Sequence, residues 1–255
     1  MKDYKEPLQA VDPIPAELPK EPEDNEKKVK GGSRLFPFLQ KVQRYSSYSF
    51  TAFLTLHAAS VIVAPVVSPE LGNSTMQFTS AVYQEAAVEP ILVYGSALAH
   101  VGAGLVLRAH KLYLDRVHYN KFLKGWANPT ILSGYVLMPI VVGHAVYHRI
   151  APQWILGDSS MITLDYVAYS LHHHPILAWS ALLSIVGVGV FHVSRGWHKW
   201  LGAWNQWKMT MQSAIISATA IAFSSVSLFR IGQLPEVTGW VAKQYHQVLE
   251  ALYID

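Results

Sequence analysis

The sequence contains no cysteine and few charged residues, and both shortages narrow the classes of protein to which it can belong. Without cysteine there is no disulfide, no thiolate zinc site and no cysteine nucleophile. Only 15% of the 255 residues are charged and 51% are hydrophobic, whereas about 25% of the residues in a soluble domain are charged. The net charge of +3 is too small to indicate a nucleic-acid partner. The composition therefore favours a membrane protein without thiol chemistry.

The charged residues are concentrated in the N-terminal segment. Residues 1–44 hold nine of the 20 Lys and Arg residues and eight of the 17 Asp and Glu residues. The same segment contains five prolines before residue 23 and no long apolar run. Such a segment buries too little apolar surface to offset the entropy lost when the chain is ordered. We therefore predict a disordered tail over residues 1–45.

Five apolar stretches without charged residues follow the tail, at residues 48–67, 90–107, 130–147, 175–193 and 210–229. A membrane-spanning helix needs about 20 mostly apolar residues. The fifth stretch is rich in serine and is the weakest of the five. Buried helices of a soluble protein are the alternative, but five such runs in 255 residues argue against it. The predicted fold is an all-α membrane protein with five transmembrane helices within residues 46–230 and a C-terminal segment at 231–255.

Positive charges in the short loops predict the orientation, because Lys and Arg accumulate on the cytosolic side of membrane proteins. The tail has nine of them, and the loops after the second and fourth predicted helices carry further clusters. The loop between the first two helices has none, and Arg149 is the single one near the loop after the third helix. We therefore predict that the tail and the even-numbered loops face the cytosol, with the C-terminal segment on the other side.

The sequence also matches itself, which predicts two tandem repeated helical hairpins followed by a fifth helix. Residues 57–65 share a His-Ala and an Ala-Pro pair with residues 144–152, at an offset of 87. Residues 90–104 share a Pro-Ile-Leu run with residues 175–189, at an offset of 85. The difference of two residues falls in the intervening loop, where changes in length are tolerated.

Small residues recur on one face of the second and fourth predicted helices: Gly95, Ala99 and Gly102, and Ser180, Ser184 and Gly187. Small residues at this spacing let membrane helices approach closely. We therefore expect these residues to serve helix packing and to carry no chemistry.

Four histidines lie inside four different predicted spans: His57, His100, His144 and His192. Ionisable side chains inside a bilayer are costly and usually functional. One interpretation is two bis-histidine b-type haems, in which His57 pairs with His144 and His100 with His192, and Arg108 and Arg195 meet the propionates. The other interpretation is interhelical hydrogen bonding that holds the bundle together.

The two predicted pairs differ in how well the two histidines match in repeat position and in depth. His57 and His144 are equivalent in the repeat, whereas at about 1.5 Å per residue His192 lies about 7–8 Å nearer to the cytosolic end than His100. The run at residues 172–174 consists of three histidines, but three neighbours cannot face one ion from a regular helix. We therefore expect no metal site there. No Ser-His-Asp order, phosphate-binding loop or carboxylate pair indicates a catalytic residue.

An apolar segment stiffened by proline lies within the tail. It consists of Pro13, Ile14 and Pro15, flanked by Val11 and Leu18. Extended segments of this kind lose little entropy on binding and suit shallow grooves or sheet edges. The alternative is a spacer with incidental prolines, and the pattern by itself leaves both interpretations open.

Several motifs together resemble those of one protein family. They are Leu56-His57, Glu89-Pro90-Ile91-Leu92, Ala99-His100-Val101, Gly143-His144 and Gly187-Val188-Gly189-Val190-Phe191-His192. Over about residues 46–202 the chain resembles the fungal mitochondrial adapter proteins of the Mcp-one family, the Mdm-ten-complementing proteins. More remotely, the layout of four histidines and five helices is similar to the cytochrome b anchor subunits of succinate dehydrogenase and fumarate reductase.

The first resemblance implies a multi-pass protein of the mitochondrial outer membrane with a cytosolic N-terminus. Its members recruit a bridge-like lipid-transfer protein of the Vps-thirteen type and support organelle contact sites and lipid homeostasis. Recruitment uses a Pro-x-Pro motif in the tail, which implies that Pro13, Ile14 and Pro15 bind the partner, beside Val11 and Leu18. The family is also associated with lipid scrambling, which makes membrane lipids a further partner and requires no chemical catalysis. The remote resemblance implies haem b as a cofactor.

Overall fold

The structure is a computed structural model that describes residues 35–119, 128–202 and 205–252. Within these ranges it contains helices and turns but no strand, which confirms the predicted all-α fold. In chain order, with η for π-helical segments, the elements are α1 (Leu35–Ala58), η1 (Ala59–Val63), α2 (Ala64–Val67), α3 (Pro69–Tyr83), η2 (Pro90–Gly95), α4 (Ser96–Tyr119), α5 (Pro129–Ala145), η3 (Val146–Ile150), α6 (Ala151–Leu156), α7 (Leu164–His173), α8 (Pro175–Trp200), α9 (Gln206–Ile231) and α10 (Gly239–Leu252).

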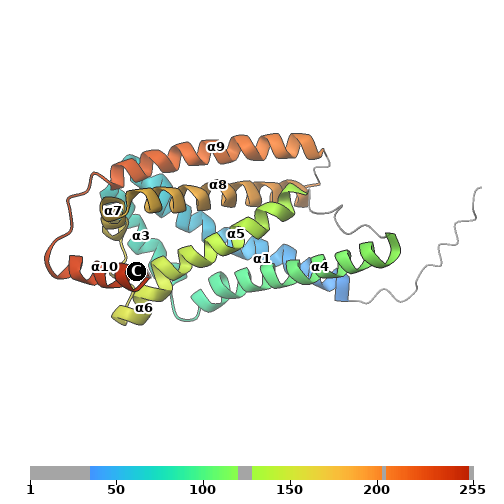
Figure 1. The fold of residues 1–255 in the computed structure, drawn as a ribbon, viewed down its shortest axis with the longest axis horizontal. Coiled ribbons are helices and arrows are strands. Elements are labelled where there is room, and N and C mark those ends of the chain that lie inside the picture. Colours follow the sequence, from blue (N-terminus) through green and yellow to red (C-terminus); the bar gives the residue numbers. More distant parts are fainter. Residues whose placement is uncertain (1–34, 120–127, 203–204, 253–255) are drawn as a thin grey trace, which may run out of the picture.

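Five helical stretches are long and apolar enough to cross a membrane: Leu35–Val67, Pro90–Leu114, Pro129–Leu156, Pro175–Trp200 and Gln206–Ile231. Each contains one of the five predicted spans, and the serine-rich fifth is among them. The long helices extend in the same general direction in Figure 1, and the short helices α6, α7 and α10 gather at one end. The prediction of five transmembrane helices is therefore confirmed.

The first helix begins earlier than predicted. α1 begins at Leu35, so residues 35–45 are helical and the predicted tail boundary at residue 45 is wrong. Lys41 and Arg44 kept these residues out of the apolar window, although long basic side chains can reach from a helix to the membrane surface. The ring centres of Phe36 and His110 of α4 are 4.4 Å apart, and the Arg44 guanidinium lies 5.6 Å from the centre of the Trp200 ring of α8. Packing against neighbouring helices thus extends α1 beyond its apolar run.

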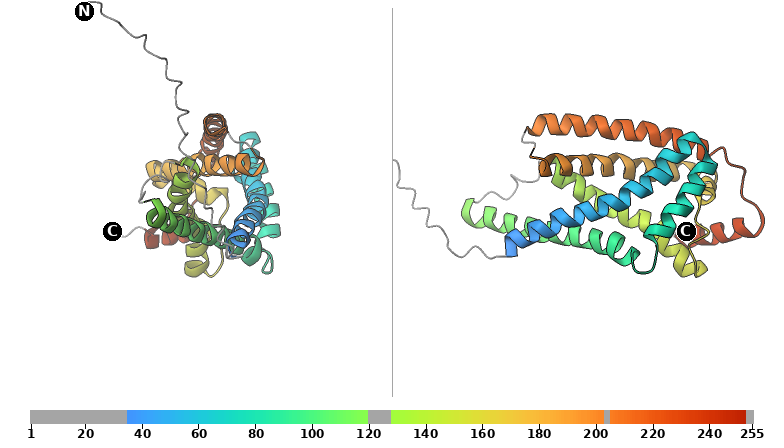
Figure 2. Two further views of the ribbon diagram at one scale, coloured as in Figure 1. Left: turned by 90° about the vertical axis from the view of Figure 1, so that its right-hand side faces the viewer. Right: turned by 180° about the vertical axis from the view of Figure 1, so that it is seen from behind.

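The long helices surround a common axis when the bundle is viewed along its length (Figure 2). α1 packs along α4, and α8 packs between α5 and α9. α9 also contacts η1 and α2, so the fifth helix joins the second hairpin to the end of the first helix. The histidine-bearing helices α1, α4, α5 and α8 therefore all belong to one bundle.

Serine side chains and glycine hold α9 close to the bundle. Ser217 Oγ donates to the Gly187 carbonyl of α8 at 2.6 Å. A Cβ added to Gly187 would lie 3.0 Å from Ile221 Cδ1 of α9, so a side chain at this position would push the two helices apart. The predicted packing role of Gly187 is therefore seen in the structure. It is wrong for Gly102, where an added Cβ would meet no atom within 4 Å.

A π-helical segment interrupts the first and third long helices at corresponding places. η1 lies just before Pro65 and η3 just before Pro152. Proline has no N–H to donate to the carbonyl four residues earlier, which favours a local widening of the helix. Ser227 Oγ of α9 donates to the carbonyl of Val61 that Pro65 leaves free, at 3.1 Å. The two segments are 87 residues apart, as in the sequence repeat, whereas duplication of the whole hairpins stays a prediction.

A layer of deeply buried residues lies at the end of the bundle where α6, α7 and α10 meet. Tyr166, Tyr245, Val248 and Leu249 are each at most 2% exposed. α10 packs against α6 and α7, and Tyr245 Oη donates to the Met161 carbonyl at 2.8 Å. This end of the bundle is opposite to the end at which α1 begins (Figure 1). The C-terminal segment therefore lies at the end far from the start of α1.

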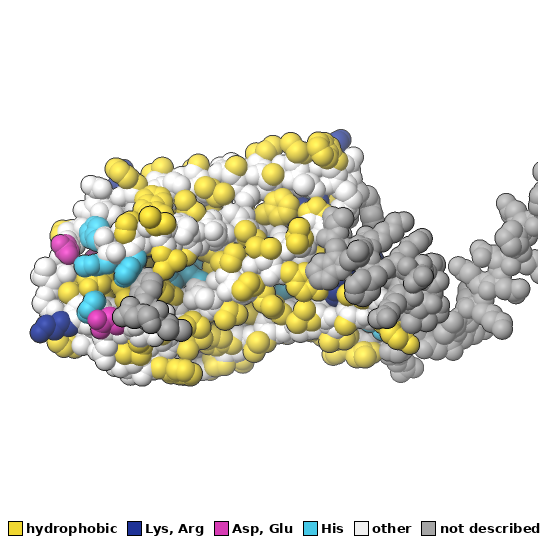
Figure 3. Space-filling view, viewed as in Figure 1, with side chains coloured by type: hydrophobic (Ala, Val, Ile, Leu, Met, Phe, Trp, Pro, Cys, Tyr) yellow, Lys and Arg dark blue, Asp and Glu magenta, His cyan; other side chains and the backbone are white. Residues whose placement is uncertain are grey.

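Apolar side chains cover the outside of the bundle. Ile91, Leu98, Ile176 and Phe229 are between 63% and 87% exposed. On the face shown in Figure 3, apolar side chains occupy the middle of the bundle and charged side chains lie toward its ends. A bilayer accounts for this distribution, because its hydrocarbon core solvates apolar groups and its surfaces solvate charged ones.

Candidate functional site

The predicted partner-binding residues of the tail lie outside the described residues. They are Val11, Pro13, Ile14, Pro15 and Leu18. Their role therefore stays a prediction from the sequence.

The structure brings the four intramembrane histidines together in the two predicted pairs. The ring centres of His57 on α1 and His144 on α5 are 5.9 Å apart, with 74° between the ring planes. Those of His100 on α4 and His192 on α8 are 6.2 Å apart, with 86° between the planes. The expected mismatch in depth between His100 and His192 is therefore wrong. It assumed straight helices whose apolar runs end at one level, whereas α8 extends to residue 200 and α4 follows a π-helical start.

Neighbouring polar groups orient three of the four rings through Nδ1. His100 Nδ1 lies 3.1 Å from the Gln43 carbonyl oxygen of α1, and His192 Nδ1 lies 3.1 Å from Ser133 Oγ of α5. His57 Nδ1 has a longer contact of 3.5 Å with Tyr83 Oη. Burial raises the pKa of the Tyr83 phenol above its ordinary value of 10.0. Each of these contacts leaves Nε2 of the same ring available for another partner.

A fifth histidine, which the sequence analysis did not single out, adjoins one pair. The ring centre of His148 is 4.6 Å from that of His144. His148 lies in η3, one residue beyond the predicted span that ends at 147. The sequence could have indicated His148 through its spacing of four residues from His144, because residues four apart lie on one face of a helix.

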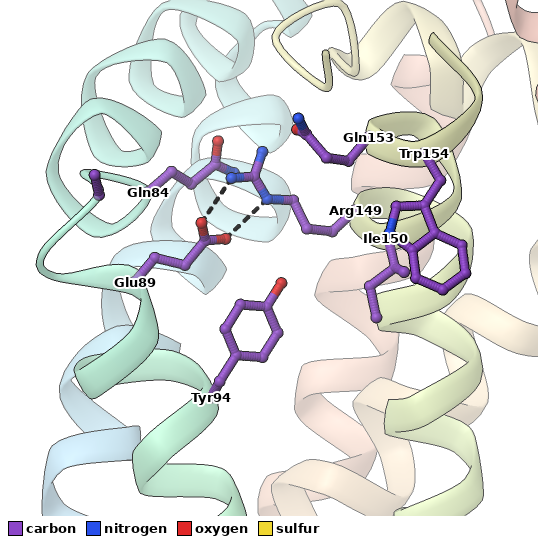
Figure 4. Close-up of a pocket in the computed structure, with 8 residues that line it drawn as sticks. Gln84, Glu89, Tyr94, Arg149, Ile150, Gln153 and Trp154 are labelled. Atoms are coloured by element: carbon purple, nitrogen blue, oxygen red, sulfur yellow. Dashed lines mark hydrogen bonds and ion pairs between the residues drawn. The ribbon is translucent and has the colours of Figure 1, made fainter. Parts of the chain in front are cut away.

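A charged cavity lies where η2 begins, facing η3 and α6 (Figure 4). Its volume is about 430 Å³. Arg149 Nε and Nη2 donate to the two carboxylate oxygens of Glu89 at 2.8 and 2.7 Å, and Arg149 also donates to Ser159 Oγ. The side chains of Arg149 and Glu89 are 25% and 15% exposed. The cavity is lined by Gln84, Ala86, Glu89, Tyr94, Arg149, Ile150, Gln153 and Trp154.

The chemistry of this cavity suits a dipolar ligand. Arg149 can bind a phosphate or carboxylate, Glu89 can bind an ammonium group, and the two already lie side by side. Trp154 is 83% exposed and offers an aromatic face beside them. Glu89 and Arg149 were not predicted as a site from the sequence, although each lies near the end of a predicted span and the two carry opposite charges.

A second charged side chain is engaged at the opposite end of the bundle. Arg195 on α8 is 1% exposed. It donates to Thr130 Oγ1 of α5 at 3.2 Å, and to Thr210 Oγ1 and Gln206 Oε1 of α9 at 2.9 and 2.8 Å. Arg195 therefore joins three helices, and the expectation that it meets a haem propionate is wrong, because protein groups already bind its guanidinium.

Comparison with known proteins agrees with this architecture. Residues 139–238 match the family model described as "MDM10-complementing protein 1, transmembrane domain". The mitochondrial adapter protein MCP1 of Saccharomyces cerevisiae is 24% identical over 233 residues, which cover 76% of this chain and 74% of that protein. No solved structure matches the chain. The matched segment includes His144, Arg149 and His192, and so one member of each histidine pair and of the ion pair. The chain is therefore similar to the MDM10-complementing protein 1 family in its membrane bundle.

Proposed function

We propose that this protein is a mitochondrial outer-membrane adapter whose helical bundle anchors a partner-binding N-terminal tail. The observation that carries the proposal is the match, over 76% of the chain, to a relative named as a mitochondrial adapter protein. The partner is a bridge-like lipid-transfer protein of the Vps-thirteen type, and the tail binds it through Pro13, Ile14 and Pro15. The adapter thereby supports organelle contact sites and lipid homeostasis.

The bundle supports this role by the place where the tail joins it. α1 begins at Leu35, at the end opposite the layer of α6, α7 and α10. Roughly 20 residues separate Pro15 from Leu35, and a chain of that length reaches at most about 70 Å. The motif, and a partner bound to it, therefore lies at most about 70 Å from the start of α1. This distance suits the delivery of lipid between a bound transfer protein and the bilayer.

A paired substitution in the tail tests the adapter role. Pro13→Ala with Pro15→Ala should abolish recruitment of the fluorescently tagged lipid-transfer protein to mitochondria, because the stiffened segment and its apolar fit are lost together. The matched control is Pro7→Ala with Pro22→Ala, which changes two tail prolines outside the motif. Both variants should remain in the mitochondrial membrane. Full recruitment by the Pro13/Pro15 variant would refute the motif, and recruitment without the whole tail would refute the tail as the binding element.

The membrane and the orientation need a separate measurement. A tag on the tail should be removed by protease added to intact mitochondria, whereas a tag after residue 255 should be cut only when the outer membrane is opened. Protection of both tags in mitochondria with an intact outer membrane would exclude the proposed location.

Lipid scrambling is a second candidate function, and the Glu89–Arg149 cavity favours it. An arginine–carboxylate pair beside an exposed tryptophan is complementary to the phosphate and ammonium groups of a zwitterionic lipid headgroup. Proteoliposomes with labelled phosphatidylcholine and dithionite quenching measure the transfer rate. Rates equal to those of protein-free vesicles would exclude scrambling. Equal transfer rates for the wild type and for Glu89→Gln with Arg149→Met would show that scrambling does not depend on this cavity.

A further inference from the structure

The histidine pair His100–His192 joins two helices across the interior of the bundle. Among the described residues, α4 packs chiefly on α1, and α8 chiefly on α5 and α9. The two rings nevertheless approach to 6.2 Å between their centres. The hydrogen bonds at Nδ1 of both rings go to other helices, to Gln43 on α1 and to Ser133 on α5. Interhelical hydrogen bonding therefore explains the Nδ1 side of each ring and leaves the approach of the two rings to each other unexplained.

The hydrogen bonds determine which nitrogen of each ring carries its proton. The Gln43 carbonyl oxygen can only accept, so Nδ1 of His100 is the donor and Nε2 holds a lone pair. Ser133 Oγ gives its single proton to the Thr130 carbonyl at 3.1 Å, so it accepts from Nδ1 of His192. Nε2 of His192 therefore also holds a lone pair. A backbone or hydroxyl acceptor on Nδ1 is the usual way in which proteins orient a histidine that binds metal through Nε2.

The distance of 6.2 Å between the two ring centres matches two histidines that bind one metal ion from opposite sides. Nitrogen ligands lie about 2.0–2.1 Å from a metal, which places the centres of two opposed imidazole rings about 6 Å apart. A metal held by protein alone needs three or four ligands. Across residues 35–119, 128–202 and 205–252, no three His, Asp or Glu side chains are grouped closely enough to supply them. The remaining ligands must therefore come with the metal, as in a planar macrocycle.

We propose that the bundle binds haem b between α4 and α8, with Nε2 of His100 and Nε2 of His192 as its axial ligands. The surroundings fit a flat, apolar group. A Cβ added to Gly134 of α5 would lie 3.0 Å from Cε1 of His192, so the absence of a side chain there makes room for the His192 imidazole. No residue in the most apolar part of α8 is fully buried, although α5 and α9 pack against it. Bound haem would supply one-electron redox chemistry, and the chain supplies the ligands and their orientation.

The second pair has similar geometry but a less defined proton position. His57 and His144 are 5.9 Å apart between ring centres. Tyr83 Oη can donate to His57 Nδ1 or accept from it, and the contact is 3.5 Å long. His100 and His192 therefore form the better-defined site, and the same experiment shows whether the other pair binds a second haem.

Absorption spectroscopy of the full-length protein tests the proposal. The protein is produced with a haem precursor, purified in detergent and incubated with hemin, and haem is counted per chain as the pyridine haemochrome. The wild type should show a Soret band and the sharp reduced α band of a low-spin, six-coordinate iron. His100→Ala and His192→Ala should each lower haem affinity by more than about tenfold, because one axial ligand is lost. His100→Met should keep the haem but raise its reduction potential.

Matched controls lie on the same two helices. His110 on α4 contacts Phe36, and His198 on α8 contacts Ser213. His110→Ala and His198→Ala should leave the spectrum and the haem content unchanged. Gel filtration and circular dichroism identify any variant that fails to fold, and His100→Met tests the site without leaving a cavity.

Three results would overturn the proposal. One is a colourless wild type after incubation with hemin. Another is an unchanged haem content and spectrum in His100→Ala and His192→Ala, which would show adventitious haem or binding at another site such as His57–His144. The third is equal loss in the His110 and His198 controls. Recruitment of the partner by the tail is measured on the same variants and should be unchanged, so failure of the haem site and failure of the adapter role are distinguishable.

Discussion

The Glu89–Arg149 ion pair should contribute measurably to stability, because it joins the start of the second long helix to the third. Arg149→Met keeps much of the side-chain volume but removes two charge-assisted hydrogen bonds of 2.8 and 2.7 Å. Hydrogen bonds to charged groups contribute about 1.5–3 kcal/mol each. The pair is 25% and 15% exposed, so water partly replaces the lost partner. We therefore expect a loss of about 2–3 kcal/mol, between the values for surface and fully buried pairs.

A double-mutant cycle isolates the interaction. Glu89→Gln should cost about 1–3 kcal/mol by itself, because it leaves the guanidinium without a counter-charge. The double variant Glu89→Gln with Arg149→Met should cost less than the sum of the two, with a coupling free energy of about 1–2 kcal/mol. Tryptophan fluorescence during unfolding in mixed micelles of SDS and a mild detergent measures each value.

The control is the exposed pair His246–Glu250 on α10, at 2.9 Å and with side chains 61% and 68% exposed. Its cycle should show no measurable coupling, because solvent screens exposed pairs. Equal coupling in the two pairs, or none at Glu89–Arg149, would refute the reasoning from partial burial.

Three further predictions concern the packing of the bundle and its end layer. Ser227→Ala leaves the carbonyl of Val61 without its partner and should cost about 1–2 kcal/mol, measured in the same unfolding assay against Ser180→Ala, whose side chain is exposed. Gly187→Leu should separate α8 from α9, because Ile221 already lies 3.0 Å from an added Cβ. The melting temperature in detergent should fall for Gly187→Leu and stay unchanged for the control Gly102→Leu. Burial raises the pKa of Tyr245 above its ordinary value of 10.0, so stability should fall as pH rises above about 10, where the unfolded chain loses the proton first. Tyr245→Phe should reduce that alkaline loss, and an identical pH profile for the variant would show that another group is responsible.

Much of the fold followed from local sequence properties. The five spans were predictable because each is an apolar run of membrane-spanning length. A single run of about 20 residues can satisfy its backbone hydrogen bonds inside a bilayer only as a helix. The start of α1 was missed because Lys41 and Arg44 interrupt the apolar pattern. The contacts of Phe36 with His110 and of Arg44 with Trp200 join residues far apart in the chain, which the local pattern does not show. The fifth helix was the weakest prediction because it is rich in serine, although it is no less apolar than the second and third spans. Only the structure shows that Ser217 and Ser227 bond to other helices.

The candidate sites were also predicted from the sequence only in part. The four histidines were identifiable because ionisable residues are rare in apolar runs. The structure then placed both pairs together, which the count of residues along straight helices did not predict for His100 and His192. The Glu89–Arg149 pair was not predicted, because 60 residues separate the two side chains and neither lies in an apolar run.

By itself, the sequence determined the membrane class, the number of crossings and the candidate residues, because hydropathy and charge act over segments of one helix length. The tertiary structure decided which side chains meet. Helix rotation, the π-helical segments at η1 and η3, and the close approach of α8 and α9 at Gly187 depend on packing between distant segments. These features set the 6.2 Å approach of His100 to His192 and the ion pair of Glu89 with Arg149. The physical reason is that local composition specifies a helix but leaves its rotation and depth to the helices that pack against it.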